Sequence, residues 1–178
     1  AAALEAGARI MQHYRNGVEA EEKSDKSPVT QADRDAEDII ERALAALAPD
    51  IQMIGEEACS EHLPDKLAPH FFLVDPLDGT RDFVAKRKDF TVNIGLISGT
   101  TPVAGVIYAP VHEKLYFSGP ESAFMMPIAL GETLNMARAE TLCVGPFPDN
   151  GLGVLASRSH RDKKTDAFIK RLHVRDVI

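Results

Sequence analysis

The stretch that decides the fold is residues 71–80, which read Phe-Phe-Leu-Val-Asp-Pro-Leu-Asp-Gly-Thr. Its first four residues are apolar and predict a buried strand, and the carboxylates of Asp75 and Asp78 follow directly. Pro76 fixes its own φ angle, and Gly79 tolerates backbone angles that a side chain would hinder, so the chain leaves the strand in a tight, ordered turn. Both acids can then face one point, which suits a divalent metal ion held against phosphate.

Helices are predicted before this stretch and strands around and after it. Apolar residues at three-and-four spacing predict amphipathic helices over residues 1–16 and about 30–48. This order indicates an α+β fold, in which paired N-terminal helices pack on an antiparallel sheet. The first two strands end in acids and are expected to meet at one edge of the sheet, and the last three are expected to form an antiparallel meander. The five predicted strands are 51–54, 71–74, 91–98, 101–108 and 114–118.

The chain after residue 118 has a different character. Glycine and proline punctuate residues 119–150, where the hydrophobic periodicity is weak, and a strand over 153–156 and a helix over 162–172 are predicted after them. We therefore expect three parts: an N-terminal α+β metal-binding domain over 1–118, a connecting segment over 119–150, and over 151–178 the start of a second α/β domain.

The composition argues against several classes of protein. The chain has 27 acidic and 20 basic residues, a net charge of −7 and no long basic run, so a nucleic-acid polymer is not an expected partner. A small anion can still bind if cations bridge it to the acidic protein. No apolar run approaches the roughly 18 residues of a membrane span, and the start lacks the features of a signal peptide, which predicts a cytoplasmic protein without a transmembrane segment. Cys59 and Cys143 belong to no zinc-binding motif and are expected to be buried free thiols.

Acidic residues gather at the ends of three predicted elements. Asp33 lies in the first turn of the second helix, the pair Glu56-Glu57 follows the first strand, and Asp75 with Asp78 follows the next. Thr30 and Asp33 also have the spacing of a capping box, so local helix physics alone can explain Asp33. As a set, carboxylates at neighbouring element ends favour Mg²⁺, which prefers hard oxygen ligands.

The turn after the second strand adds a phosphate-binding feature. Gly79 and Thr80 precede a short helix expected over residues 81–86, and amides at a helix start can bind phosphate. A water on the metal, near Glu56 and Thr80, could be activated as hydroxide and attack phosphorus in line. No local motif supports a nucleophilic Ser, Cys or His side chain.

Together these residues resemble the magnesium-dependent, lithium-sensitive phosphatases that include inositol monophosphatase and fructose bisphosphatase. The resemblance is strongest to the 3′(2′),5′-bisphosphate nucleotidase branch and covers about residues 4–173. Besides residues 75–80, the matching segments are Gly55-Glu56-Glu57, residues 25–30 together with Asp33, and residues 90–94, 108–111 and 157–160.

The resemblance implies a layered sugar-phosphatase-like fold and a role for each matching residue. Glu56 is implied both to bind metal and to take part in catalysis. Glu57 is expected to point away from the metal, because successive residues of an extended chain face opposite ways. The segment containing Ser159 and His160 is implied to lie near the second phosphate or the base of a nucleotide, although a polar turn capping the next helix explains that segment as well. The implied metal ligands are Glu56, Asp75, the Leu77 carbonyl and Asp78; the groups assisting the attacking water are Asp33 and Thr80; the substrate-binding residues are Asp78, Gly79, Thr80, Ser159 and His160.

The implied activity is removal of the 3′-phosphate of adenosine 3′,5′-bisphosphate to give AMP and phosphate, a reaction of sulfur metabolism. The resemblance also implies a monomer or homodimer, with two or three Mg²⁺ ions in the complete enzyme. Two alternatives stay open: an inositol or sugar monophosphatase, and a non-catalytic module that binds metal and nucleotide. The family continues into a second α/β domain whose Trp-Asp-x-Ala segment supplies a last metal ligand. This chain has no Trp, so the resemblance implies that the second domain is incomplete and that this ligand lies beyond Ile178.

Overall fold

The computed structural model describes residues 1–17, 19–23, 28–62, 64–157 and 161–178. These form two compact units, residues 1–142 and 143–178. In chain order the elements are α1 (Ala2–Asn16), β1 (Ala20–Glu22), β2 (Pro28–Thr30), α2 (Gln31–Leu47), β3 (Gln52–Gly55), α3 (Glu56–Glu61), β4 (His70–Asp78), α4 (Thr80–Val84), β5 (Thr91–Ser98), β6 (Thr101–Ala109), β7 (Lys114–Ser118), β8 (Ala123–Pro127), the 3₁₀ turn η1 (Met136–Arg138), β9 (Glu140–Leu142), β10 (Leu152–Val154), α5 (Lys163–Ile169) and β11 (Val174–Val177).

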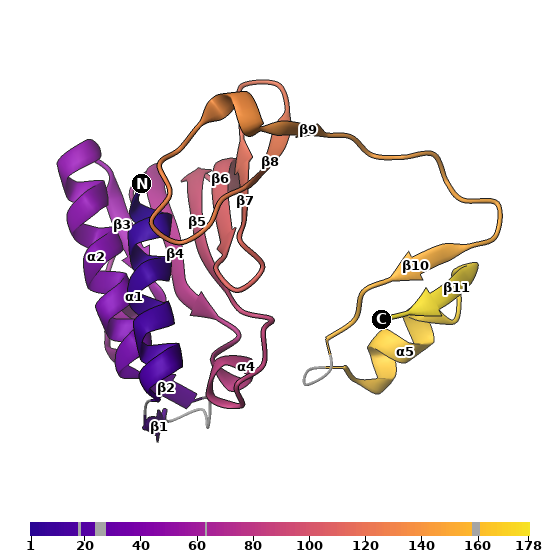
Figure 1. Cartoon of the computed structure of the whole chain (residues 1–178), viewed down its shortest axis with the longest axis horizontal. Coiled ribbons are helices and arrows are strands. Elements are labelled where there is room, and N and C mark those ends of the chain that lie inside the picture. The colour runs from indigo at the N-terminus through magenta and orange to yellow at the C-terminus, as the bar shows by residue number, and fades with distance from the viewer. Residues whose placement is uncertain (18, 24–27, 63, 158–160) are drawn as a thin grey trace. The chain divides into compact units, whose positions relative to one another are not determined.

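The two predicted N-terminal helices are confirmed, and they lie side by side on one face of the main sheet (Figure 1). The start of α2 is the predicted capping box: the Thr30 side chain accepts a hydrogen bond from the backbone, and the Asp33 side chain accepts one from the Thr30 backbone. Strands β1 and β2, which the sequence pattern did not predict, pair antiparallel, and the last residue of β2 is the capping Thr30.

The main sheet has seven strands in the order β3-β4-β5-β6-β7-β8-β9. The predicted meander over β5, β6 and β7 is confirmed, but the sheet is not antiparallel throughout, because β3 and β4 run parallel. Strands β8 and β9 extend the sheet into residues 119–150, so the expected boundary at residue 118 falls inside it.

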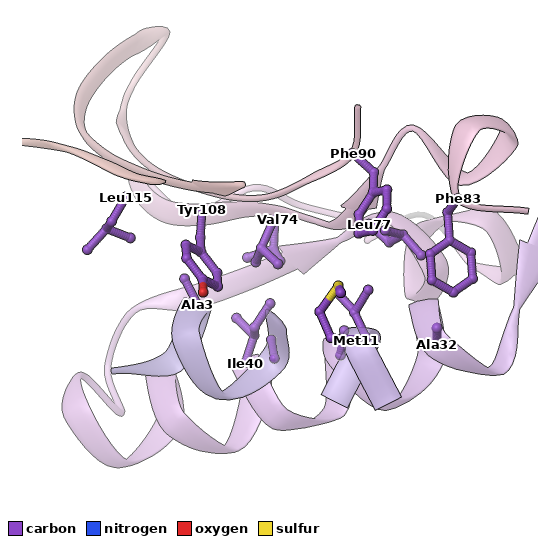
Figure 2. Close-up of a cluster of buried hydrophobic side chains, with 14 of the residues drawn as sticks. Ala3, Met11, Ala32, Ile40, Val74, Leu77, Phe83, Phe90, Tyr108 and Leu115 are labelled. Carbon is purple, nitrogen blue, oxygen red and sulfur yellow. The ribbon is translucent and has the colours of Figure 1, made fainter. Parts of the chain in front are cut away.

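The core lies between the helix pair and the sheet (Figure 2). Ile40 of α2 faces Val74 of β4, while Tyr108 of β6 lies over the first turns of α1. The other face of the sheet is more exposed: Leu73 of β4, expected in a buried strand, is 51% exposed because alternate residues of a strand point to opposite faces.

The second unit is a small βαβ arrangement in which β10 and β11 pair in parallel and α5 connects them. The strand and helix predicted here are confirmed, each shorter than expected, and β11 was not predicted. The side chain of Asp162 caps α5 by accepting a hydrogen bond from the backbone N–H of Thr165, at 2.7 Å.

Two expectations from composition have different outcomes. Both cysteines are free, but Cys59 is half-buried and Cys143 is exposed, so the expectation of burial was wrong. Among the described residues, no helix combines the length and the apolar character that a membrane crossing requires.

Packing of α1 against the sheet yields a testable prediction. A Cβ atom added at Gly7 would lie 2.5 Å from a ring carbon of Tyr108, which is 0% exposed and has no room to move. We expect Gly7→Ala to lower the free energy of unfolding by about 1–3 kcal/mol through overpacking, despite the roughly 1 kcal/mol that alanine gains over glycine in a helix. Urea denaturation measures the change.

The matched control is Gly105→Ala, where the new Cβ would meet only the Ile94 carbonyl at an ordinary 3.7 Å. That variant should stay within about 0.5 kcal/mol of the wild type. If Gly7→Ala is as stable as the control, α1 does not pack on Tyr108 as described.

Candidate functional site

The parallel pairing of β3 and β4 brings the first two acidic clusters together. Gly55, the last residue of β3, is aligned with Val74 of β4. The next residue along each chain segment is an acid: Glu56 is the first residue of α3, and Asp75 lies within β4, where the parallel pairing ends. The two acids therefore lie at the same edge of the sheet. This confirms the expected meeting of the two strand ends.

A bulge in β4 places Asp75 and Asp78 on the same side. Asp75 is aligned with Asn93 of β5 and Asp78 with Thr91, so three steps along β4 match two along β5. In a regular strand, residues three apart would point to opposite faces, and the extra residue removes this difference. Pro76 lies within the bulge, where its missing N–H does not break a regular ladder.

Asp75 has the most perturbed environment of the acids. Its Oδ1 atom is buried and has no hydrogen-bond partner. Burial, followed by the nearby carboxyls of Glu56 and Asp78, raises the pKa of Asp75 to about 8. A buried acceptor without a partner, facing two further carboxyls, matches the donor set that a divalent cation requires, so the residues present fit such an ion.

Asp33 and Thr80 form a buried pair beside these acids. Asp33 is 1% exposed, and its Oδ1 accepts a hydrogen bond from the Thr80 hydroxyl at 3.0 Å. Its Oδ2 accepts two more, from the backbone N–H and the hydroxyl of Thr30 at 2.8 and 2.7 Å. Burial raises the pKa of Asp33, and the hydrogen bonds from Thr30 and Thr80 oppose that rise. The Thr80 oxygen also lies 3.0 Å from the Leu77 carbonyl, which brings the predicted backbone ligand to the same place.

Lys23 links the two glutamates in the first turn of α3. Its ammonium donates to Glu56 at 3.1 Å and to Glu57 at 2.8 Å, while its side chain is only 12% exposed. Glu57 was expected to point away from the metal because successive residues of an extended chain face opposite ways, and this reason was wrong. Glu56 and Glu57 both lie in the first turn of a helix, and both accept a hydrogen bond from the Lys23 ammonium. Burial lowers the pKa of Lys23, but the two carboxylates raise it by more. Lys23 was missed because its position in a polar loop carries no periodic pattern.

Asn93 is a second residue that the sequence reasoning missed. Its side-chain amide donates to Asp78 at 3.1 Å, and its carbonyl oxygen accepts from the Thr91 hydroxyl at 3.0 Å. This orientation keeps an N–H, and not an oxygen, toward the Asp78 carboxylate. Because Thr91 and Asn93 are two apart on β5, the strand period alone puts them on one face.

Glu37 is the third missed residue, and it is an 8% exposed carboxylate on α2. It accepts hydrogen bonds from the backbone N–H groups of Glu57 and Ala58. The helical spacing of residues 33, 37, 40 and 44, all buried in α2, could have indicated its inward position.

The predicted ligands are close together but are not yet arranged around an ion. Within the described ranges, no three His, Cys, Asp or Glu side chains already stand in position to hold a metal. Glu56 is instead paired with Lys23 through Oε1, so a metal ion would compete with the ammonium for that oxygen. Ser159 and His160 lie outside the described residues, as do residues 25–27 of the matching segment 25–30.

The sequence matches the inositol monophosphatase family over residues 1–176. It is 35% identical over 172 residues to the 3′(2′),5′-bisphosphate nucleotidase CysQ of Salmonella typhimurium and 33% identical to that of Escherichia coli K12. Each alignment covers 96% of this chain and 66% of the relative, so the chain spans slightly less than two thirds of the relatives' length.

Solved structures give the same result. CysQ from Bacteroides thetaiotaomicron is 30% identical and superposes with a TM-score of 0.73 over 99% of this chain and 69% of its own. The extragenic suppressor protein SuhB from Bartonella henselae is 25% identical, with a TM-score of 0.72 over 99% of this chain and 65% of its own. The predicted α+β, sugar-phosphatase-like fold is therefore confirmed.

The environment of Asp75 predicts how stability depends on pH when metal is absent. Folding raises its pKa from 3.8 to about 8, so protonated Asp75 stabilises the fold below pH 4 and that contribution is lost as the pH rises through 8. We expect the free energy of unfolding, measured with chelator between pH 5 and 9, to fall with rising pH more steeply in the wild type than in Asp75→Asn. Parallel curves for the two proteins would contradict this account of Asp75.

Proposed function

The chain belongs to the inositol monophosphatase family, and on this premise we propose that it hydrolyses adenosine 3′,5′-bisphosphate to AMP and phosphate with Mg²⁺ as cofactor. The observation that carries the proposal is the buried, unpartnered Oδ1 atom of Asp75, whose carboxyl lies near those of Glu56 and Asp78 and beside the Asp33–Thr80 pair.

Glu56, Asp75, Asp78 and the Leu77 carbonyl would hold the metal, because all four are oxygen donors at one edge of the sheet. When bound, the ions lower the pKa of water and neutralise charge on the transferring phosphoryl group. By analogy with the family, two or three ions act together in the full-length protein.

Asp33 and Thr80 are proposed to take the proton of the attacking water. The Thr80 hydroxyl donates to Asp33, which leaves its lone pairs available to accept from a water molecule. As the water oxygen bonds to phosphorus, the bond from phosphorus to the 3′-oxygen of the nucleotide breaks. One proton of the water passes to Thr80 Oγ1 and the Thr80 proton passes to Asp33 Oδ1, while the departing 3′-oxygen takes a proton from solvent. The upward shift of the Asp33 pKa, caused by burial, makes this carboxylate a better proton acceptor.

The turn after β4 has a backbone conformation suited to binding a phosphate beside the proposed metal ligands. Gly79 has φ of 93°, and a Cβ there would lie 2.8 Å from the Asp89 carbonyl, so only glycine fits. The turn would direct the backbone N–H groups of Gly79 and Thr80 toward a phosphate beside Asp78.

The choice of substrate rests on the relatives. Relatives that are 33–35% identical over almost the whole chain are named as 3′(2′),5′-bisphosphate nucleotidases. A small phosphorylated nucleotide is therefore the proposed substrate, in preference to inositol or sugar monophosphates.

The proposal predicts the substrate preference and the effect of two substitutions. With Mg²⁺, the full-length protein should release phosphate from adenosine 3′,5′-bisphosphate at least about tenfold more efficiently than from inositol monophosphate, a difference of about 1.4 kcal/mol in activation free energy.

Asp33→Asn and Thr80→Val should each reduce kcat by about 100-fold or more, because proton transfer is impaired. Asp38→Asn, an exposed acid of the same helix, is the control and should leave kcat unchanged.

Each alternative has its own outcome in this assay. Equal release from both substrates would reject the nucleotide assignment and favour an inositol or sugar monophosphatase. Nucleotide binding that requires Mg²⁺ but gives no phosphate would identify a non-catalytic binding protein.

A further inference from the structure

One buried carboxylate near the site has no place in the proposed chemistry. Glu37, on α2, is 8% exposed, and it accepts a hydrogen bond at Oε2 from the backbone N–H of Glu57 at 2.9 Å. Its Oε1 accepts a second from the N–H of Ala58, at 2.8 Å. Both oxygens are thus used on the first turn of α3.

The start of α3 is shaped to receive this carboxylate. The residue preceding the helix is Gly55, which has no side chain to cap the free N–H groups. A Cβ at Gly55 would lie 2.5 Å from the Glu37 carboxyl carbon, so the glycine leaves the space that Glu37 fills. Glu37 therefore caps α3 from another helix, and its negative charge suits the positive end of the α3 dipole.

The capped turn carries Glu56, the proposed metal ligand on α3. A helix of six residues is not stable by itself, so its position depends on tertiary contacts. The Glu56 side chain is 47% exposed and receives little support from packing. The backbone on which it stands is instead tied to α2, the helix that also carries Asp33.

We propose that Glu37 is a positioning residue that holds the first turn of α3 so that Glu56 faces Asp75 and Asp78. This inference rests on the proposed function, because it takes Glu56 as a metal ligand. Glu37 does not touch the metal or the substrate; it fixes the backbone from which one ligand extends. Groups that orient metal ligands in this way typically change metal affinity by 10- to 100-fold when mutated.

The test compares Glu37→Gln with Glu41→Gln in the full-length protein. Glutamine at residue 37 keeps the size but offers one acceptor oxygen to two N–H donors, whereas Glu41 lies one turn along the same helix and is exposed. By isothermal titration with Mg²⁺, we expect the dissociation constant of Glu37→Gln to rise about 10- to 100-fold and that of Glu41→Gln to stay at the wild-type value.

Two further readouts separate positioning from a loss of stability. The Mg²⁺ concentration giving half-maximal phosphate release should rise with the dissociation constant, while kcat at saturating Mg²⁺ should return to within about threefold of the wild type, as expected when only metal binding is weakened. Amide hydrogen exchange at Glu57 and Ala58 should accelerate in Glu37→Gln.

A Glu37→Gln protein that binds Mg²⁺ as tightly as the wild type, even with a lower melting temperature, overturns the inference. If that variant does not fold, Gly55→Ala provides the decisive comparison. Its new Cβ displaces the Glu37 carboxylate and leaves the charges of Glu37 and Glu56 in the protein. Unchanged Mg²⁺ affinity in Gly55→Ala also overturns the inference. A wild type that binds Mg²⁺ but releases no phosphate contradicts the proposed function alone, and the titration still decides the role of Glu37.

Discussion

Carboxylates gathered at one edge of a sheet repel one another, and the fold around them is organised by the need to offset that repulsion. Most of these acids have a donor supplied by a different element. Asp33 is bonded by Thr30 and Thr80, Glu37 by the start of α3, Glu56 and Glu57 by Lys23, and Asp78 by Asn93. The Oδ1 atom of Asp75 is the exception among the described residues, because it is buried without a partner.

The same donors tie together the elements that carry the site. The capping box fixes Asp33 at the start of α2, one turn before Glu37 on the same buried stripe. Glu37 then holds α3, and the parallel β3–β4 pair sets α3 beside the bulge that contains Asp75 and Asp78. The arrangement explains why a charged cluster can stand on a well-packed core: α2 and β4, which carry Asp33, Glu37, Asp75 and Asp78, also contribute apolar side chains to that core.

Much of this could be predicted from the sequence, because it depends on short-range patterns. Helical spacing predicted α1 and α2, and the run ending in Asp75 predicted the strand and the acids near its end. Strand β8 was not predicted, because its residues do not alternate between apolar and polar. It is identified by its pairing with β7, where Phe124 stacks on Phe117 at 5.4 Å between ring centroids. Glu37 was missed for a similar reason. Its inward position follows from the helical spacing of α2, but its role as a cap becomes apparent only when α3 supplies two N–H groups.

The central claim is that the acids of β4 and α3 share a divalent ion. The most direct measurement is the anomalous difference density of Mn²⁺ in crystals of the full-length protein. The account predicts a peak within about 2.5 Å of carboxylate oxygens of Glu56, Asp75 and Asp78, with the Lys23 ammonium displaced from Glu56. A peak elsewhere, or none at millimolar Mn²⁺ with Lys23 still bound to Glu56, would contradict it.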